Sequence, residues 1–290
     1  MSLYVNTNTE ALIAQNNLNS TESALNTSMT DLSSGLRINT AADDAAGYAI
    51  SEDLTGQISG LNQANSNAQD ATSLIQTADG ALNDVEQMLQ TVRELAVQYN
   101  GGTLDATDQN AIVSEVTQLV CQIDQIGNQS QFNGISLFAP TGTMSLNGVT
   151  VGSITFQIGS NDGQTISVTL QALTGSSGLL SVLDQINAGG TSTTFSLGAS
   201  GVLATIDGLI NQVSTLAGQF GAVQNRLSYT MDNLSTYSEN LTSANATIED
   251  VDMASEMTQF TQQQILEQSG ISMLSQAEQN PQLILKLLQG

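Results

Sequence analysis

Apolar side chains recur every seven residues through two long stretches of this chain, and no other feature constrains its fold as strongly. In residues 54–99, thirteen of the fourteen positions that lie on this repeat, or three residues after it, are apolar. Residues 206–251 have the same pattern, again with thirteen apolar positions of fourteen. A repeat sustained this long is typical of a coiled-coil or bundle helix with one narrow apolar seam. We therefore predict a mainly α-helical fold, in which long heptad-patterned helices form an elongated coiled coil or bundle.

Upstream of the first stretch, the repeat changes phase. The upstream series of apolar residues seven apart includes Leu18, Leu25 and Leu32. This series is one residue out of register with the repeat of residues 54–99. A slip of this kind marks a hinge or a segment boundary. We place the hinge at Arg37 and the paired acids Asp43 and Asp44.

A second phase change follows residue 251, where the second repeat would continue onto polar residues. The apolar series that replaces it includes Met253, Met257, Phe260, Leu274, Ile284 and Leu288. Each end of the chain is therefore expected to form an amphipathic helix of its own. Because packing supplies most helical stability, these helices either pair with each other or stay disordered until a partner buries their seams. We predict that the two terminal apolar series are assembly surfaces.

The segment between the two repeats has a different pattern. Residues 154–170 alternate apolar and polar side chains around an Asn-Asp-Gly turn, which predicts a β-hairpin. Residues 171–202 are rich in Gly, Ser and Thr and are expected to form a small distal cap or a loop. The predicted division is therefore a terminal helix in 1–45, a central bundle in 46–170 and 203–250 with the cap between its parts, and a terminal helix in 251–290.

The balance of charges excludes several classes of function. The chain has 4 Lys and Arg against 27 Asp and Glu, which gives a formal net charge of −23. So few bases cannot neutralise a phosphate track or form a polybasic membrane surface, and we expect no nucleic-acid or membrane partner. With no His and a single Cys, His-ligated metals, Cys clusters and an intramolecular disulfide are excluded. We expect no enzyme activity, no catalytic residues and no cofactor or metal.

Several sequence blocks resemble those of bacterial flagellins. The longest is LSSGLRINTAADDAAG at residues 32–47, and VRELAVQ at 92–98 and QFNG at 131–134 follow in the expected order and spacing. The C-terminal stretch ISMLSQAEQNPQLILKLL at 271–288 is similar to the flagellin tail. Many flagellins insert large variable outer domains in the middle of the chain, where this sequence keeps only about residues 171–202.

The resemblance implies a structural subunit that self-assembles into the hollow helical filament of the bacterial flagellum, a propeller for motility. In this family the terminal helices form the inner coiled-coil tube and are disordered in the free subunit. The resemblance also implies type III export to the exterior, with export machinery, a cognate chaperone and a filament cap as partners. Export by this route accounts for an N-terminus that lacks the features of a cleavable signal peptide.

Two alternatives remain open at this point: a hook–filament junction protein, and a secreted coiled-coil effector or adhesin. The resemblance also implies a surface that a host Toll-like receptor detects. The positions that match this surface are Gln90, Leu95 and Glu115. Thr91 stands where many detected flagellins have Arg, whose forked donor a Thr cannot replace.

Overall fold

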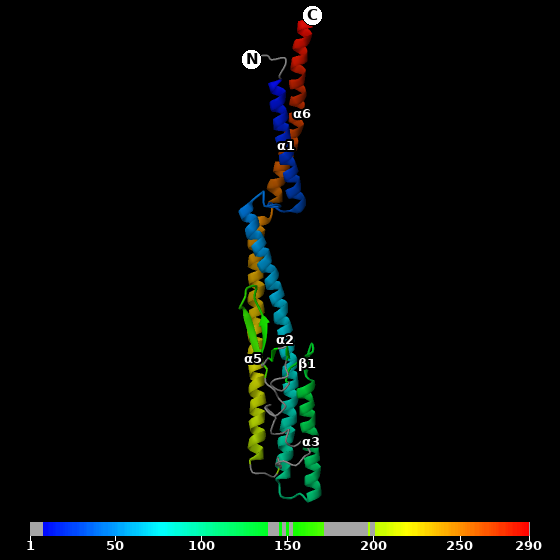
Figure 1. The fold of residues 1–290 in the computed structure, drawn as a ribbon, viewed down its shortest axis with the longest axis vertical. Coiled ribbons are helices and arrows are strands. Elements are labelled where there is room, and N and C mark those ends of the chain that lie inside the picture. The colour runs from blue at the N-terminus through cyan, green and yellow to red at the C-terminus, as the bar shows by residue number, and fades with distance from the viewer. Residues whose placement is uncertain are drawn as a thin grey trace. The chain divides into compact units, whose positions relative to one another are not determined.

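A computed structural model describes residues 8–138, 145–146, 149–150, 153–170, 197 and 201–289. In these residues the chain forms five helices: α1 (Thr9–Ser34), α2 (Ala45–Tyr99), α3 (Ala106–Gln129), α5 (Val202–Glu249) and α6 (Met253–Gln289). Helices account for most of the structure (Figure 1), which confirms the mainly α-helical fold predicted from the repeats. The chain divides into two compact units, residues 59–238 and residues 1–58 together with 239–290.

The core of the unit formed by residues 59–238 is built on the two predicted repeats. From Leu61 to Ala96, the repeat positions of α2 are at most 2 % exposed. The α5 repeat meets them with side chains that include Ile206, Val213, Phe220 and Leu227. Helix α3 adds Val116 and Ile123 to the same core. The narrow seams thus pack against one another, as heptad-patterned helices require.

Helix α2 runs without interruption through Asp79 and Gly80. The adjoining repeat residues Ala78 and Leu82 are fully buried. A helical Gly costs about 1 kcal/mol relative to Ala, and burying side chains on both sides of it outweighs that cost. Helix α2 ends at Tyr99, before Gly101 and Gly102, and Asp105 is the N-cap of α3.

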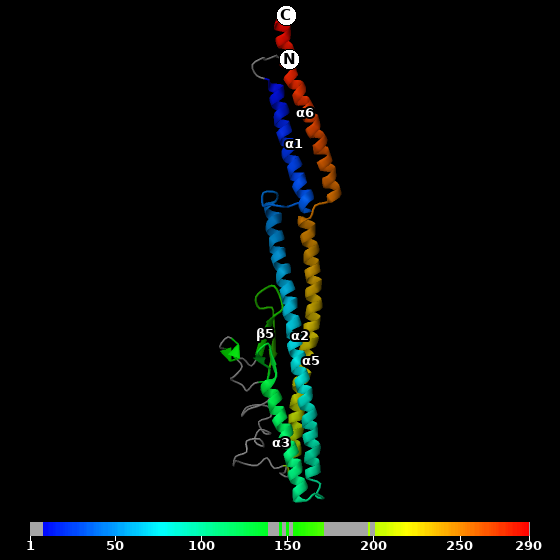
Figure 2. The same ribbon diagram turned by 90° about the vertical axis from the view of Figure 1, so that its right-hand side faces the viewer.

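The predicted β-hairpin is present as β5 (Ser153–Gln157) paired antiparallel with β6 (Thr165–Thr169). Its turn contains Gly163 at φ +83°, a conformation that favours glycine. The side chain of Asn67 on α2 donates a 3.0 Å hydrogen bond to the carbonyl oxygen of Gln157, and this bond anchors the hairpin to the helix. Figure 2 shows the hairpin beside α2.

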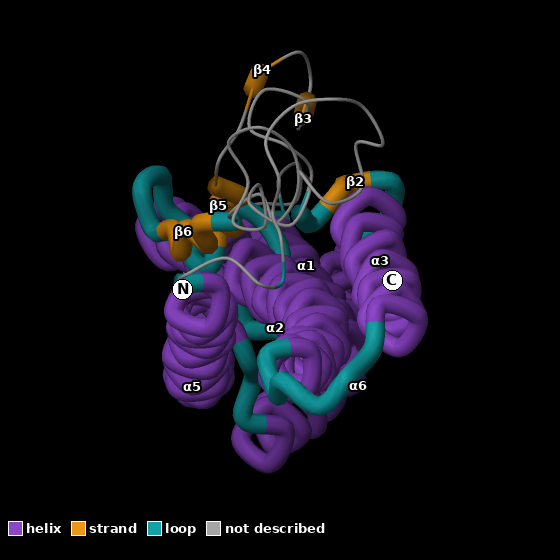
Figure 3. Tube along the Cα trace, turned by 90° about the horizontal axis from the view of Figure 1, so that it is seen from below, coloured by secondary structure: helices purple, strands orange, loops and turns teal. Residues whose placement is uncertain are grey.

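Two further pairs of antiparallel strands are only two residues long each: β1 (Gln131–Phe132) with β2 (Ile135–Ser136), and β3 (Ser145–Leu146) with β4 (Val149–Thr150). Figure 3 distinguishes these short strands from the helices by colour. Most of the predicted cap at 171–202 lies outside the described residues. Among the described residues, no helix is both long and apolar enough to cross a membrane.

Candidate assembly surface

Helices α1 and α6 lie side by side and antiparallel within the unit formed by residues 1–58 and 239–290 (Figures 1 and 2). The face of α1 that is turned away from solvent follows a spacing of three and four residues. Its members are Ala11, Ala14, Leu18, Thr21, Ala24, Leu25, Ser28, Asp31 and Leu32. The three leucines predicted as seam residues therefore lie on this face, each of them half-buried.

The matching face of α6 contains polar, small and large apolar residues. It consists of Glu256, Phe260, Gln263, Glu267, Gly270, Leu274 and Ala277. At its centre α1 approaches closely, because a Cβ atom on Gly270 would lie 3.3 Å from Leu18 Cδ1. Near its far end, the Asn8 side chain donates a 2.7 Å hydrogen bond to the carbonyl oxygen of Ala277. The contact thus combines small and polar residues with half-buried large apolar side chains, among them Leu18, Phe260 and Leu274.

Most large apolar side chains of α6 lie outside its contact with α1. Met253 and Met257, two of the predicted seam residues, are exposed, whereas Phe260 and Leu274 face α1. The side chains of Ile284 and Leu288 lie outside the described residues. The other exposed apolar residues of the two helices are Leu12, Ile13, Met29, Ile265, Leu266, Ile271 and Met273. Each terminal helix therefore has apolar side chains that no contact within the described chain covers.

A groove of about 610 Å³ runs between α1 and α6. Its apolar walls include Ile13, Leu18, Leu266 and Met273. Ile13 is 60 % exposed and Met273 is 65 % exposed, so the mouth of the groove is an apolar surface. Sequence reasoning missed Ile13, Leu266 and Met273 because they do not lie on the heptad series. The sequence did contain a signal for them, because apolar residues also occur in both terminal segments outside the heptad series.

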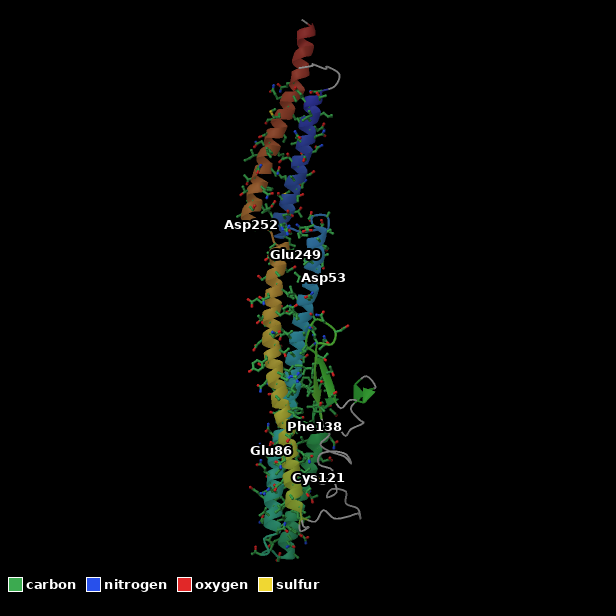
Figure 4. The ribbon with its side chains drawn as sticks, turned by 90° about the vertical axis from the view of Figure 1, so that its left-hand side faces the viewer. Asp53, Glu86, Cys121, Phe138, Glu249 and Asp252 are labelled. Atoms are coloured by element: carbon green, nitrogen blue, oxygen red, sulfur yellow. The ribbon has the colours of Figure 1, made fainter. Side chains whose placement is uncertain are left out.

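The predicted hinge is a short antiparallel clasp between two distant parts of the chain. Leu36 and Asp250 form a β-bridge, and the Val251 amide donates a 3.1 Å hydrogen bond to the carbonyl oxygen of Gly35. The Arg37 amide donates to the carbonyl oxygen of Glu249, and its guanidinium donates to that of Ile248. The clasp therefore joins the loop after α1 to the break between α5 and α6, which Glu249 and Asp252 flank in Figure 4.

The paired acids of the predicted hinge organise the loop that precedes α2. Asp44 caps the helix, because its Oδ1 accepts hydrogen bonds from the amides of Ala46 and Gly47. Asp43 Oδ2 accepts from the amides of Asn39 and Thr40 and from the Thr40 hydroxyl. The bonds from Thr40 hold the pKa of Asp43 below its usual value of 3.8. Both carboxylates thus have structural hydrogen-bonding roles.

The residues of the predicted receptor surface lie on two helices of the unit formed by residues 59–238, which we call the central unit. Gln90 on α2 and Glu115 on α3 are exposed, whereas Leu95 is only 9 % exposed and belongs to the core. On the same helix as Gln90, Arg93 forms an ion pair with Asp207 of α5, with 2.5 Å between Nε and Oδ1. Leu95 therefore presents little area to a partner.

The remaining chemistry of the described residues is sparse. Cys121 on α3, labelled in Figure 4, is half-buried and forms no disulfide. The described part of the chain contains no group of three or more Cys, Asp or Glu side chains placed to hold a metal ion. The features that the structure offers for function are therefore its surfaces.

Comparison with known proteins shows which family has this architecture. Residues 5–143 match the bacterial flagellin N-terminal helical region, and residues 203–288 match the bacterial flagellin C-terminal helical region. A flagellin of Bacillus subtilis (strain 168) is 45 % identical over 305 residues, which cover 99 % of this chain and 100 % of that protein. The chain belongs to the bacterial flagellin family.

Two other flagellar proteins are similar to this flagellin. The flagellar filament 33 kDa core protein of Treponema phagedenis is 39 % identical over 287 residues, covering 99 % of this chain and 100 % of that protein. The crystal structure of Bacillus cereus flagellin is 27 % identical, covers 62 % of this chain and 94 % of that chain, and has a TM-score of 0.47. Its relatives in sequence make this flagellin a structural subunit of the flagellar filament.

Proposed function

We propose that the α1–α6 pair is the surface through which this flagellin binds neighbouring subunits in the filament. The observation that carries the proposal is the exposure of large apolar side chains on both helices. Full burial of one Leu, Ile or Met side chain contributes about 1.5–3 kcal/mol. Several such side chains, repeated in every subunit, supply a driving force for a helical polymer built from one type of contact that does not close.

The incomplete burial of apolar side chains on α1 and α6 supports the same proposal. Within one chain, side chains such as Leu18, Phe260 and Leu274 are half-buried between the two helices, whereas most other large apolar side chains of α6 stay exposed. The groove beside Ile13 and Met273 lies open along this contact. Neighbouring subunits would complete the packing that a single chain leaves unfinished. The terminal helices then form the inner part of the filament, and the central unit forms the layer around it.

Secretion is part of this proposal. The family resemblance supports passage through the flagellar type III export channel, with the export machinery, a cognate chaperone and a filament cap as partners. The finished polymer is then an extracellular filament that works as a propeller. Because the work is mechanical, the function needs no catalytic group.

A host Toll-like receptor is a further proposed partner. The exposed side chains Gln90 and Glu115 support this proposal, and both match positions of the receptor-binding surface in detected flagellins. Leu95, the third matching position, lies in the core and offers little surface for such contact.

Seeded polymerisation tests the proposal. Purified protein is added to short filament fragments, and extension is followed by electron microscopy. We expect the unmodified chain to extend the seeds, and the Ile13→Ser and Met273→Ser variants to extend them poorly while keeping their far-ultraviolet circular dichroism. Val97→Ser is the matched control, because Val97 is also exposed but lies on α2 of the central unit. Equal extension by all four proteins would show that the groove is not an assembly surface.

A further inference from the structure

Where the structure describes the side chains of both helices, at residues 8–34 and 253–279, the contact between α1 and α6 contains carboxylates but no base. Asp31 on α1 and Glu256 and Glu267 on α6 are all half-buried on the faces that the two helices turn toward each other. Within the described residues, none of the three forms an ion pair. An antiparallel helix pair usually places opposite charges across its contact, so this arrangement opposes pairing at neutral pH.

The register of the two helices brings two of these carboxylates together. Leu18 lies beside Gly270, and Asn8 bonds to the Ala277 carbonyl. In an antiparallel pair, a residue that lies further along α1 contacts a residue that lies correspondingly earlier in α6. Asp31 therefore lies opposite the first turn of α6, which contains Glu256.

The groups around Asp31 do not neutralise it. Helix α6 contributes Glu256, and the loop before α2 contributes Asp43 and the Asn39 amide, which donates a 2.8 Å hydrogen bond to Asp31 Oδ1. The base nearest in sequence is Arg37, whose guanidinium donates to the Ile248 carbonyl. Burial is the largest influence on the pKa of Asp31 and raises it, the Asn39 bond lowers it, and the charges of Glu256 and Asp43 raise it further; the net direction is upward from 3.8.

The other bases of the chain are engaged or distant. Arg93 is paired with Asp207 in the central unit, where Arg226 also lies. Lys286 is thirty residues beyond Glu256 on α6, which corresponds to about 45 Å along a helix. Among the residues that the structure describes, no positively charged side chain is therefore placed to relieve the repulsion between Asp31 and Glu256.

We propose that the α1–α6 pair is a latch that acid closes: protonation at the Asp31–Glu256 contact removes the repulsion between the two helices and favours their pairing within a single chain. This inference concerns one subunit, and it holds or fails separately from filament formation. It gives the chain a conformational response to pH in the helices that the proposed function assigns to assembly.

The sign of the effect follows from proton linkage. A carboxyl group whose pKa is higher in the paired state than in the unpaired state binds protons when the helices pair. Pairing therefore strengthens as the pH falls from neutrality toward 3.8, the ordinary value for Asp31. Below pH 3.8 the Asp31 carboxyl is protonated in both the paired and the unpaired state, and the stabilisation of pairing has reached its full value.

Amide hydrogen exchange of the full chain, below the concentration at which it polymerises, tests the latch. Protection of residues 9–34 and 253–279 is measured between pH 7 and pH 4, after correction for intrinsic exchange rates, with α3 as the internal reference. We expect protection of α1 and α6 relative to α3 to rise as the pH falls. We expect Asp31→Asn and Glu256→Gln each to raise it at pH 7 by about 1.5- to 5-fold and to weaken its pH dependence.

The double variant and a charge-matched control make the test specific. Asp31→Asn combined with Glu256→Gln is expected to gain little over either single variant, because one contact is relieved in each case. Glu22→Gln removes the same charge from an exposed position of α1 and is expected to keep the pH response. Protection that stays flat or falls in acid would overturn the inference. A response unchanged in Asp31→Asn, or lost equally in Glu22→Gln, would also overturn it.

Discussion

The backbone amide of Arg37 donates a 2.6 Å hydrogen bond to the carbonyl oxygen of Glu249. The chain thus leaves α1 and enters α6 at one place, where residues 35–37 pair with residues 249–251. Apart from the Arg37 guanidinium, the contacts of this clasp are made by backbone groups. The two segments in which the sequence repeat changes phase therefore pair with each other at a single joint.

Gly47 is predicted to be essential to the loop that leads into α2. A Cβ atom at this position would lie 2.5 Å from Asp44 Oδ2 and 2.7 Å from Ile38 Cδ1, and Ile38 is fully buried. We expect Gly47→Ala to lower the free energy of unfolding by about 1–3 kcal/mol. Chemical denaturation followed by circular dichroism measures the change.

Gly56→Ala is the matched control for that prediction. Gly56 lies in the same helix, and nothing lies within 4 Å of the position that its Cβ would take. We expect this substitution to stabilise the chain by about 0.8–1 kcal/mol. A destabilisation of equal size in both variants would contradict the account of Gly47.

Asp43 is predicted to make the same loop sensitive to strong acid. The hydrogen bonds from Thr40 and Asn39 lower its pKa below 3.8 in the folded chain. Its stabilising contribution is therefore present above 3.8 and is lost as the pH falls through the lowered pKa. We expect Asp43→Asn to reduce stability at pH 7 and to weaken the pH dependence of unfolding below pH 3.8. If the stability of Asp43→Asn falls below pH 3.8 as steeply as that of the unmodified chain, this role of Asp43 is refuted.

The long helices were predictable from sequence because burial of one face of a helix requires apolar residues at a regular spacing. Ala68, Ile75 and Leu82 occupy successive heptad positions, and all three are fully buried. The hairpin was predictable because its turn residues and strand alternation are local signals. In both cases the information lies within a few tens of residues.

The assembly surface was only partly predictable. Leu18 and Phe260 lie on the faces between α1 and α6, as their spacing suggested, whereas Met253 and Met257 are exposed. A heptad series identifies a seam, but it does not state which neighbour covers it. The sequence contains little sign of the clasp at Arg37. Backbone groups form most of its hydrogen bonds, and they come from two segments that are far apart in the sequence.

Net charge is predicted to control polymerisation. A filament brings many subunits of formal charge −23 together, and their mutual repulsion opposes assembly at neutral pH. Proton binding to carboxylates relieves it, so we expect the critical concentration to fall between about pH 7 and pH 4–5. Added salt is expected to lower it at pH 7 by screening.

Sedimentation of seeded subunits across pH and salt measures both effects. Protonation of every carboxylate would change the formal charge from −23 to −23 + 27 = +4, a small residual charge. Filaments that dissolve on mild acidification, or that are indifferent to salt at neutral pH, would show that repulsion does not control assembly.

Receptor detection is predicted to be weak and to improve on substitution of Thr91. This residue is exposed on α2 beside Gln90, and its hydroxyl donates to the Gln87 carbonyl. We expect Thr91→Arg to increase Toll-like receptor activation, because a guanidinium offers a forked donor to a partner. A titration of reporter cells compares the two proteins. Full potency of the unmodified protein, with no gain for the variant, would contradict this prediction.

The most direct test of the central claim, that the terminal helices build the filament, compares seeded polymerisation of the full chain with that of chains lacking residues 1–40 or 253–290. Filament mass is measured by sedimentation, and circular dichroism checks that the central bundle remains folded. We predict that both truncated chains keep a helical bundle and add no filament mass, while the full chain extends the seeds. Normal filaments from either truncated chain would contradict the claim.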